Sequence, residues 1–600
     1  MPIITVLPGG TEFAYRPGPT LLELLLDHST TIENPCNGRG LCGKCKVRHL
    51  DGELPDPTSA ERQHLTQKEQ EGRIRLACLV HPEHDISIAT NQSEKNNRIL
   101  VGGAVPDFEF APTIHKKTIS VSKPSLDAQM PFEEMFSQVA GTETLNIQML
   151  KKLSAAESAY TAVLSDGVLL AIEPGDTADK LYGLAIDIGT TTVVVSLVDL
   201  NNGEILGSAT AINAQKIYGL DVLSRITYIM ENPETGAKKL QRAIVECLNG
   251  LIAQLCGDSG VSTEHIYNIT AAANPTMMHM LLGVDASPLG VSPFAPVFVK
   301  ARNVAAADIG LLGSENCQLY CLPGVSAYVG SDIVAGVYVS GLAEESGSAL
   351  FIDIGTNGEI VVNHKGVLIS CSCAAGPALE GMNISAGVRA AAGAIENVTF
   401  NQTSFEIAAI DGEKPSGICG SGIISAVSAL LSGGFLKSGG MLRRIEEFDD
   451  GDCRRDFLWQ EGRNRGVRIY EDISITQRDV RQVQLAKGAI SSGFCALLEI
   501  AGLEMRNLGR VVIAGQFGAH LDAGSLIGIG LLPREASGKI TYIGNSSHTG
   551  AYLALVSKPS RAAMENLAPR ITYKELSVLP GFERIFRNSL EFPSGTDGAS

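Results

Sequence analysis

Two similar stretches decide the fold of this chain of 600 residues: AIDIGTTTVVVSLVDL at residues 185–200 and LFIDIGTNGEIVV at residues 350–362. Each contains a run of apolar, largely β-branched residues with an aspartate near its end, which predicts a buried strand. The Gly-Thr pair that follows predicts a tight turn. The two aspartates, Asp187 and Asp353, are 166 positions apart. An internal repeat of this kind predicts two halves with similar α/β folds.

The Gly-Thr turns have the chemistry of a phosphate site. Backbone N–H groups and threonine hydroxyls in such a bend hold phosphate oxygens, while the aspartate orients Mg²⁺ through water. A single aspartate at a strand end is more often a turn residue, but two copies in the same order favour phosphate binding. The candidate residues are Asp187, Gly189, Thr190 and Thr191 in the first turn and Asp353, Gly355 and Thr356 in the second.

Together the repeats resemble the phosphate-1 and phosphate-2 loops of the actin, sugar-kinase and heat-shock-chaperone ATPase superfamily, a duplicated ribonuclease H-like fold. VVIAGQFGAHLD at residues 511–522 resembles its adenosine loop through Gly515 and Gly518, and CGSG at residues 419–422 resembles a connecting segment. The resemblance implies ATP and Mg²⁺ as cofactors. It makes Asp187 and Asp353 the candidate catalytic residues, without choosing between them as the base.

Four cysteines near the N-terminus have the spacing of iron–sulfur ligands. Cys36, Cys42 and Cys45 share one glycine-rich loop as C-x5-C-x2-C, and Cys78 follows after 32 intervening residues. Three thiolates on one loop with a distant fourth suit a [2Fe–2S] cluster. A four-cysteine zinc site and unligated core thiols are the alternatives, but zinc sites usually carry two C-x2-C pairs.

The elements around these cysteines predict a small β-grasp domain. Residues 3–7 and 12–15 suit a β-hairpin, Thr20 suits a helix N-cap, and Thr58 with Glu61 suits a capping box. Residues 1–94 thus resemble the plant-type and vertebrate-type [2Fe–2S] ferredoxins, which implies that the four cysteines are the cluster ligands. The nearby bases are either a solvated rim or a docking patch for an acidic partner: Arg39, Lys44, Lys46 and Arg48.

The expected organisation is an α/β multidomain chain. Residues 1–91 are a [2Fe–2S] ferredoxin-type domain, and residues 92–125, which are polar with scattered prolines, are a flexible linker. Residues 126–180 are a small α/β middle domain with one helix and a hairpin at Asp166-Gly167. Residues 181–600 are an actin-like ATPase domain in two halves, about 181–345 and 346–600.

Composition excludes several classes of protein. The chain has 48 Lys and Arg against 65 Asp and Glu, a net charge of −17, so most of its surface repels nucleic acid. It lacks a signal peptide and any apolar stretch of about 18 residues, so we expect a cytoplasmic protein with no membrane partner. Nine of the 13 cysteines lie outside the cluster motif and are expected to be buried structural thiols.

The full combination resembles the reductive activators of corrinoid proteins along essentially the whole chain, including AAANPTMMHMLLG at residues 271–283 and ITQRDVRQVQLAKGAI at residues 475–490. The resemblance implies that one electron passes from an external donor through the [2Fe–2S] cluster to a corrinoid protein. ATP then drives reduction of Co(II) to Co(I), and the C-terminal domain forms a homodimer. Within the first phrase, His279 is expected to be a core or capping residue rather than one that faces the corrinoid.

Two functions of other classes remain open from the sequence. The chain could be a ferredoxin-fused small-molecule kinase, or an electron carrier whose second part is a non-hydrolysing scaffold. ATP consumption that depends on an acceptor would indicate the kinase, consumption that depends on a corrinoid protein the activator, and none the scaffold.

Overall fold

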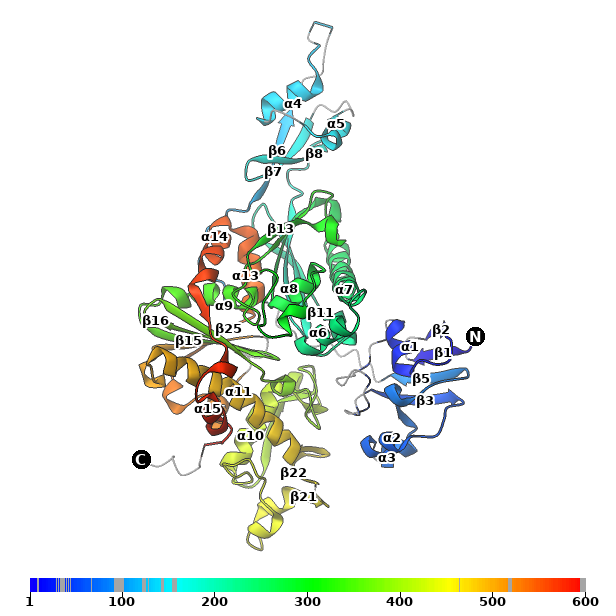
Figure 1. Cartoon of the computed structure of the whole chain (residues 1–600), viewed down its shortest axis with the longest axis vertical. Helices are drawn as coiled ribbons and strands as arrows, with labels where there is room; N and C mark the ends of the chain where they lie inside the picture. Colours follow the sequence, from blue (N-terminus) through cyan, green and yellow to red (C-terminus); the bar gives the residue numbers. More distant parts are fainter. Residues whose placement is uncertain are drawn as a thin grey trace.

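The structure is a computed structural model of the whole chain (Figure 1). It describes all residues except 8–9, 29, 31, 33–37, 39, 41–42, 44, 66, 91–101, 121–125, 128, 142–144, 154–158, 463, 516–520 and 594–600. Cys36, Cys42 and Gly518, together with Arg39 and Lys44 of the basic rim, therefore lie outside the described residues.

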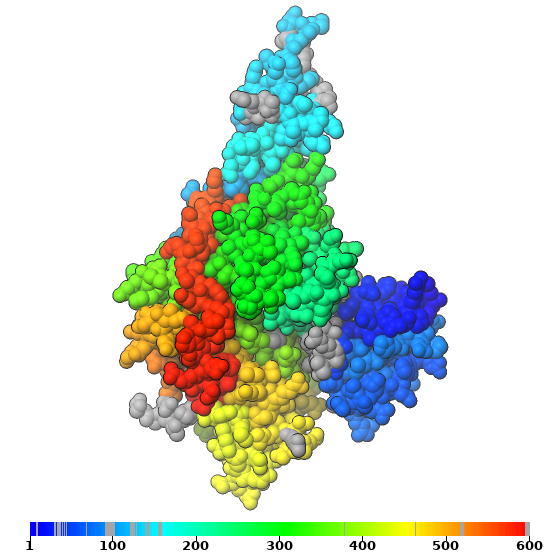
Figure 2. Space-filling model, viewed as in Figure 1, coloured from blue at the N-terminus to red at the C-terminus, as the bar shows by residue number. Residues whose placement is uncertain are grey.

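The N-terminal region has the β-grasp order that the sequence predicts. Its five strands lie in the order β2-β1-β5-β3-β4 and form a lobe of their own, blue in Figure 2. Both predicted caps are present, because Thr20 and Thr58 each accept a backbone hydrogen bond from the glutamate three residues on. The elements are β1 (Ile3–Leu7), β2 (Thr11–Ala14), α1 (Leu21–Asp27), β3 (Lys46–Gly52), α2 (Ser59–His64), α3 (Gln67–Glu71), β4 (Ile74–Leu76) and β5 (Ile86–Thr90).

A second small sheet, β6-β7-β8, carries two helices, whereas the sequence predicted one. The predicted turn is present, since Asp166 and Gly167 both have positive φ, 49° and 82°, between the paired strands β7 and β8. The elements are β6 (Ile114–Ser120), α4 (Phe132–Ala140), α5 (Ile147–Leu153), β7 (Ala159–Ser165) and β8 (Val168–Pro174).

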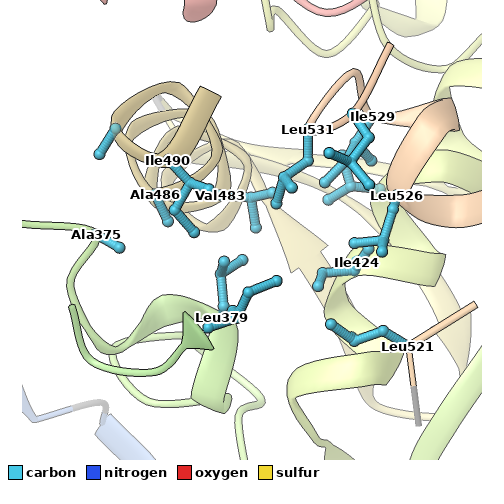
Figure 3. Packing of buried hydrophobic residues seen from close by; sticks show 14 of the residues in the cluster. Ala375, Leu379, Ile424, Val483, Ala486, Ile490, Leu521, Leu526, Ile529 and Leu531 are labelled. Atoms are coloured by element: carbon cyan, nitrogen blue, oxygen red, sulfur yellow. The ribbon is translucent and has the colours of Figure 1, made fainter. Parts of the chain in front are cut away.

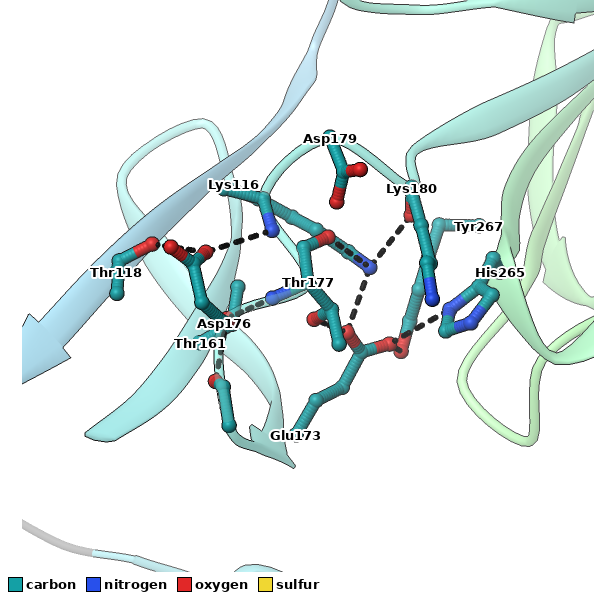
Figure 4. A network of polar contacts seen from close by, with 12 residues as sticks. Lys116, Thr118, Thr161, Glu173, Asp176, Thr177, Asp179, Lys180, His265 and Tyr267 are labelled. Atoms are coloured by element: carbon teal, nitrogen blue, oxygen red, sulfur yellow. Dashed lines mark hydrogen bonds and ion pairs between the residues drawn. The ribbon is translucent and has the colours of Figure 1, made fainter. Parts of the chain in front are cut away.

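Strand β6 lies inside the range 92–125 that the sequence assigned to a flexible linker, so this part of the prediction is wrong. The strand pairs with β7 along its whole length. Its Lys116 has a fully buried side chain that donates to Glu173 Oε2 at 2.6 Å and to the Lys180 carbonyl at 2.6 Å (Figure 4). Glu173 also accepts from Tyr267 of the next sheet, which joins the small sheet to the main body.

Two six-stranded sheets confirm the predicted duplication. The first contains the order β11-β10-β9-β12-β14 and the second β17-β16-β15-β24-β25. In both, the first three strands are mutually antiparallel and the last three are parallel. The strands are β9 (Tyr182–Ile188), β10 (Thr192–Asp199), β11 (Ile205–Ile212), β12 (Ile266–Ala273), β13 (Arg302–Ala305), β14 (Gln318–Cys321), β15 (Ser348–Ile354), β16 (Gly358–His364), β17 (Val367–Cys373), β24 (Arg510–Ala514), β25 (Ile540–Gly544) and β26 (Ile571–Tyr573).

Helices cover these sheets, and one crosses between them. Helix α13 follows β25 of the second sheet but packs on β9 and β12 of the first. Helices of the first half are α6 (Val222–Glu231), α7 (Gly236–Ser259), α8 (Pro275–Leu281) and α9 (Ser331–Ser340). Those of the second are α10 (Gly420–Ser432), α11 (Gln477–Ala501), α12 (Ala523–Gly528), α13 (Ser546–Val556), α14 (Lys558–Leu567) and α15 (Phe582–Ser589).

Two three-stranded sheets complete the second half: β18 (Ala394–Phe400), β19 (Phe405–Ala409) and β20 (Gly417–Ile418), and β21 (Leu458–Glu461), β22 (Asn464–Tyr470) and β23 (Ile473–Thr476). Among the described residues, one helix, α11, is long and apolar enough to cross a membrane. Because 78% of its apolar window is buried against the rest of the protein, α11 fits the core helix of a folded domain.

Candidate nucleotide pocket and iron–sulfur site

One pocket lies where the two main sheets meet, and it gathers both repeats. Every described candidate residue of the phosphate turns and the adenosine loop lines it: Asp187, Gly189, Thr190, Thr191, Asp353, Gly355, Thr356 and Gly515. The lining also includes residues to which the sequence assigned no role: Asn274, Asp332, Glu359, Glu380, Asn545 and Ser547. The structure thus brings together residues from distant parts of the chain.

Asp187, at the end of β9, is held firmly. Its Oδ2 accepts from Asn545 Nδ2 at 2.9 Å and its Oδ1 accepts from Ser547 Oγ at 2.7 Å. Burial raises the pKa of Asp187, and the two hydrogen bonds oppose that rise. Both donors come from the start of α13, so this helix fixes the orientation of the carboxylate.

Three more carboxylates gather near Asp187. Burial, reinforced by the neighbouring aspartates, raises the pKa of Asp353 to about 7, and burial also raises the pKa of Asp332 to about 7. The pKa of Glu359 is raised well above its usual value, mainly by burial and by the two aspartates. Clustered carboxylates repel one another, and a divalent cation relieves that repulsion.

This donor set fits Mg²⁺ with water between the ion and most side chains. Oxygen ligands are what Mg²⁺ prefers, and it keeps several of its waters. Among the described residues, no three His, Cys, Asp or Glu side chains converge as direct ligands of one ion. The carboxylates are therefore suited to orient a hydrated cation rather than to enclose a bare one.

Each Gly-Thr turn is closed by a backbone hydrogen bond from its glycine, but the first turn is one residue longer than the second. Gly189 N–H donates to the Thr192 carbonyl and Gly355 N–H donates to the Asn357 carbonyl, both at 2.9 Å. The first turn has extra support from Arg225, a fully buried guanidinium on α6 whose Nη2 donates to the Thr190 carbonyl at 2.6 Å. Burial lowers the pKa of Arg225 to about 9.

Glu380 joins the two turns. It lies at the end of a short 3₁₀ helix, Pro377–Glu380, and accepts from Thr356 Oγ1 at 2.6 Å and from Thr191 Oγ1 at 3.4 Å. The preceding Leu379 packs between α10 and α11, close to Ile424 and Val483, which fixes this helix (Figure 3). One buried carboxylate therefore contacts both candidate phosphate turns.

Gly515 is required by geometry at the end of β24. Its φ is +101°, and a Cβ there would lie 2.5 Å from the Ile354 carbonyl oxygen and 2.7 Å from Asp353 Oδ1. Any side chain would collide with the second turn. Gly518, the other glycine predicted for this loop, lies outside the described residues.

The described half of the cysteine site fits a cluster. The Sγ atoms of Cys45 and Cys78 are 3.2 Å apart, and both residues are buried. The hydrogen bond from Cys45 lowers the pKa of Cys78 to about 7, helped by the backbone N–H of Gly40 and opposed by burial. Paired thiols with a depressed pKa and backbone donors suit thiolate ligation of iron.

Of the basic rim, Lys46 and Arg48 are described. Lys46 pairs with Glu69 of its own domain at 2.5 Å, whereas Arg48 is exposed. Behind them, the buried Arg75 donates from Nε and Nη2 to the two oxygens of Glu61, both at 3.0 Å. Whether the four bases form a solvated rim or a docking patch stays open, because Arg39 and Lys44 lie outside the described residues.

His279 and the nine other cysteines have mostly structural surroundings. His279 Nδ1 lies 2.7 Å from the Pro275 carbonyl oxygen and Nε2 accepts from the Val297 N–H, so both ring nitrogens are paired inside the core, as expected. Six of the nine cysteines are buried: Cys256, Cys317, Cys321, Cys371, Cys373 and Cys419. Cys247 and Cys453 are partly exposed and Cys495 is exposed, which differs from the expectation.

Comparison with known proteins decides the family. Family models match residues 4–83 as a 2Fe-2S iron-sulfur cluster binding domain, residues 182–345 as the RACo middle region and residues 347–598 as the C-terminal domain of RACo, the ASKHA domain. The corrinoid activation enzyme RamQ of Eubacterium limosum is 32% identical over 93% of both chains. The chain belongs to the family of corrinoid reductive activators.

Other members of this family agree. A solved structure of a reductive activator for corrinoid, iron-sulfur protein is 33% identical, covers 99% of both chains and superimposes with a TM-score of 0.73. A [Co(II) methylated amine-specific corrinoid protein] reductase of Methanosarcina barkeri is 24% identical over 66% of this chain and 74% of its own. The predicted fold class of a ferredoxin-type domain with a duplicated ATPase-type body is thereby confirmed.

Sequence reasoning did not place the six pocket residues named above in the site, and two kinds of signal could have found four of them. Asp332 and Glu380 lie in LPGVSAYVGSDIVAG (322–336) and AAGPALEGMNISAG (374–387), where each is the one charged residue between several glycines. Asn274 and Asn545 each follow a strand and cap a helix, a position at which a polar side chain can reach a ligand. Glu359 and Ser547 have no comparable local signal.

Proposed function

We propose that this chain uses ATP hydrolysis to drive one-electron reduction of a corrinoid protein from Co(II) to Co(I). The observation that carries the proposal is that both phosphate turns and five carboxylates meet in one pocket, in a chain that belongs to the corrinoid activators. The proposal includes Mg²⁺ as the ion of the pocket, an external one-electron donor, a homodimer through the C-terminal domain and a cytoplasmic location.

Residues of the pocket bind and orient the nucleotide. The hydroxyls and backbone N–H groups of the two turns donate to phosphate oxygens, and Gly515 leaves room beside the second turn. When bound, MgATP supplies the free energy of phosphoanhydride hydrolysis. Closure of the two halves around it excludes water from the buried carboxylates and strengthens their electrostatic effect.

Asp353 is better suited than Asp187 to take a proton from the attacking water. Both oxygens of Asp187 already accept hydrogen bonds, so it is suited to hold charge. Asp353 accepts no hydrogen bond from the described residues, and its raised pKa of about 7 suits a general base near neutral pH. Asp332 lies close enough to share this role electrostatically.

The cysteine site positions the electron carrier. Cys45 and Cys78 present their sulfurs side by side, and the other two ligands of the proposed set are Cys36 and Cys42. When bound, a [2Fe–2S] cluster supplies reversible one-electron chemistry. The chain holds the sulfurs in place and provides the N–H donor of Gly40 to Cys78.

The direct test measures cobalt reduction and ATP loss together. The chain, a low-potential reductant and a Co(II) corrinoid protein are mixed with and without MgATP, and Co(I) is followed by its visible absorption. We expect ATP to be needed for Co(I) and the corrinoid protein to stimulate ATP hydrolysis. ATP loss that depends on a small-molecule acceptor would indicate a kinase instead, and cobalt reduction without ATP would indicate a plain electron carrier.

The cluster assignment has its own test. Cys78→Ser should remove most of the iron and the visible absorption of the cluster while leaving nucleotide binding intact, because the two sites have separate cores. Cys495→Ser, which changes an exposed cysteine on α11, is the matched control and should keep full iron content. A Cys78→Ser chain with a normal spectrum would remove Cys78 from the ligand set.

A further inference from the structure

A short segment that follows the ferredoxin domain is fastened to the nucleotide pocket. Residues 102–104 run beside the end of β25, with a bridge between Gly103 and Gly544. Ala104 N–H donates to the Ile543 carbonyl at 3.0 Å and Asn545 N–H donates to the Gly102 carbonyl at 3.4 Å. Gly103 N–H donates to Thr549 Oγ1 at 3.1 Å. Backbone of the segment is thus bonded to β25, to Asn545 and to α13.

Only glycine fits at position 103. A Cβ there would lie 2.2 Å from the Ile543 carbonyl oxygen and 3.2 Å from both the Asn545 nitrogen and Thr549 Oγ1. A contact of 2.2 Å with backbone cannot be relieved by turning a side chain, so the segment would have to move away. The neighbouring Gly102 would meet nothing within 4 Å, so an alanine is accommodated there.

The residue that this segment holds is a central part of the pocket. Asn545 donates from Nδ2 to Asp187, and its Oδ1 accepts from the His548 N–H, which caps α13. The preceding Gly544 accepts from the Gly515 N–H at 3.1 Å. Residues 543–545 therefore connect the first phosphate turn, the adenosine loop and residues 102–104.

The segment continues along α13 toward the small sheet. Ala111 N–H donates to the Val556 carbonyl and Lys558 N–H donates to the Ala111 carbonyl, at 2.9 and 2.8 Å. Phe108 packs edge-to-face on Tyr552, with ring centroids 6.1 Å apart. Residues 102–111 are consequently attached to α13 at both of its ends, and in the sequence they come directly after the stretch that follows the ferredoxin domain.

We propose that residues 102–104, with Gly103 at their centre, are a positioning element that couples the nucleotide pocket to the ferredoxin domain. They hold Asn545 in the place from which it orients Asp187. A change at Asp187 on nucleotide binding is passed through Asn545 to the point at which the chain leaves the body toward the cluster. This inference rests on the proposed function for the identity of the nucleotide, and the contacts that carry it are independent of the cluster.

Gly103→Ala in the full chain tests the proposal, with Gly102→Ala as matched control. We expect Gly103→Ala to raise the Kd for MgADP at least fivefold and to halve the Co(I) formed per ATP hydrolysed, with iron content unchanged. Gly102→Ala should stay within twofold of the parent chain in both. If Gly103→Ala only loosened the packing, its Tm would fall below that of Gly102→Ala, while the amount of Co(I) formed per ATP hydrolysed would stay at the value of the parent chain.

Hydrogen exchange on the unaltered chain keeps the test valid if Gly103→Ala folds poorly. The amides of Gly103 and Ala104 are donors in the contacts described, so MgADP should slow exchange in peptides that cover residues 102–111. If the chain binds MgADP with no such slowing, or if Gly103→Ala binds and couples like the parent, the positioning role is wrong and the proposed function stands. If the chain binds no nucleotide, the positioning role and the proposed function are both wrong. If MgADP slows amide exchange in residues 102–111 but no cobalt is reduced, only the proposed function is wrong.

Discussion

The two Asp-Gly-Thr repeats follow equivalent strands but differ in the length of their turns and in their surroundings. Each aspartate is the last residue but one of a central strand, β9 or β15. Gly189 N–H bonds to the carbonyl three residues on, whereas Gly355 N–H bonds to the carbonyl two residues on, both at 2.9 Å. Asp187 is held by two donors from α13, whereas Asp353 accepts nothing from the described residues and lies against Gly515. The duplication thus preserved the sheet topology and the place of the aspartate, whereas the turn length and the contacts of each carboxylate differ.

This difference suggests a division of work. A carboxylate held by two donors keeps its orientation, while one with free acceptor capacity and a pKa raised to about 7 exchanges protons near neutral pH. We expect both to be needed for the proposed hydrolysis, but they should respond differently when altered.

The largest expected effect is the loss of cobalt reduction when the aspartate of either repeat is removed. Asp187→Ala and Asp353→Ala should each lower ATP-dependent cobalt reduction by at least about 100-fold, because each removes a charge that acts on the phosphates. Iron content and the visible spectrum of the cluster should not change. Asp258→Ala, an exposed position at the end of α7, is the control. Full cobalt reduction by either variant would mean that its repeat has only a structural role.

Stability should separate the two repeats. Asp187→Ala leaves the donors of Asn545 and Ser547 buried without an acceptor and should lower the free energy of unfolding by about 2–4 kcal/mol. Asp353→Ala strands no described donor and, at pH 8, removes a buried charge whose pKa is raised to about 7, so it should raise the free energy of unfolding by on the order of 2–4 kcal/mol. Denaturant unfolding at pH 8 with EDTA measures both. Equal losses would show that the two carboxylates are held alike.

The pH dependence of stability should follow Asp353. Because its pKa is raised to about 7 in the folded chain, its protonated form stabilises the fold fully below about pH 4, and this contribution is lost as the pH rises through 7. Asp353→Asn stays neutral, so its stability relative to the parent should grow between pH 5 and pH 8, by on the order of 2–4 kcal/mol. Parallel unfolding curves, measured with EDTA and without nucleotide, would contradict the raised pKa.

The smallest expected effect concerns the glycines. A Cβ at Gly189 would lie 2.9 Å from the Thr192 carbonyl oxygen, whereas one at Gly355 would lie 3.6 Å from the Asn357 carbonyl oxygen. Gly189→Ala should therefore lower the free energy of unfolding by about 1–2 kcal/mol. Gly355→Ala should lower it by less than about 0.5 kcal/mol. The reverse order would show that the first turn relaxes more easily than the second.

The sequence predicted what depends on local pattern. A strand that ends in Asp-x-Gly-Thr is a local signal, so both turns and Gly515 were found, and the capping boxes at Thr20 and Thr58 were found for the same reason. Glu359, Glu380 and Ser547 become part of the pocket only when distant elements pack together. No local spacing records such long-range contacts.

Strand β6 shows why a strand with a buried ion pair was predicted as a linker. IHKKTIS at residues 114–120 carries three basic or ionisable side chains in seven positions, which favoured a solvated linker. Lys116 is nevertheless buried, because Glu173 neutralises its charge and two carbonyls accept its remaining protons. A buried pair of this kind makes an alternating strand resemble a polar segment, and only the partner strand reveals it.

The contact of Glu380 with both turns has a consequence for the rate of nucleotide entry. A phosphate group that uses the hydroxyls of Thr191 and Thr356 has to replace a carboxylate that already accepts from both. Association then contains a first-order step, the departure of Glu380, after the diffusional encounter. The observed rate of binding should rise with nucleotide concentration at first and then level off at the rate constant of that departure.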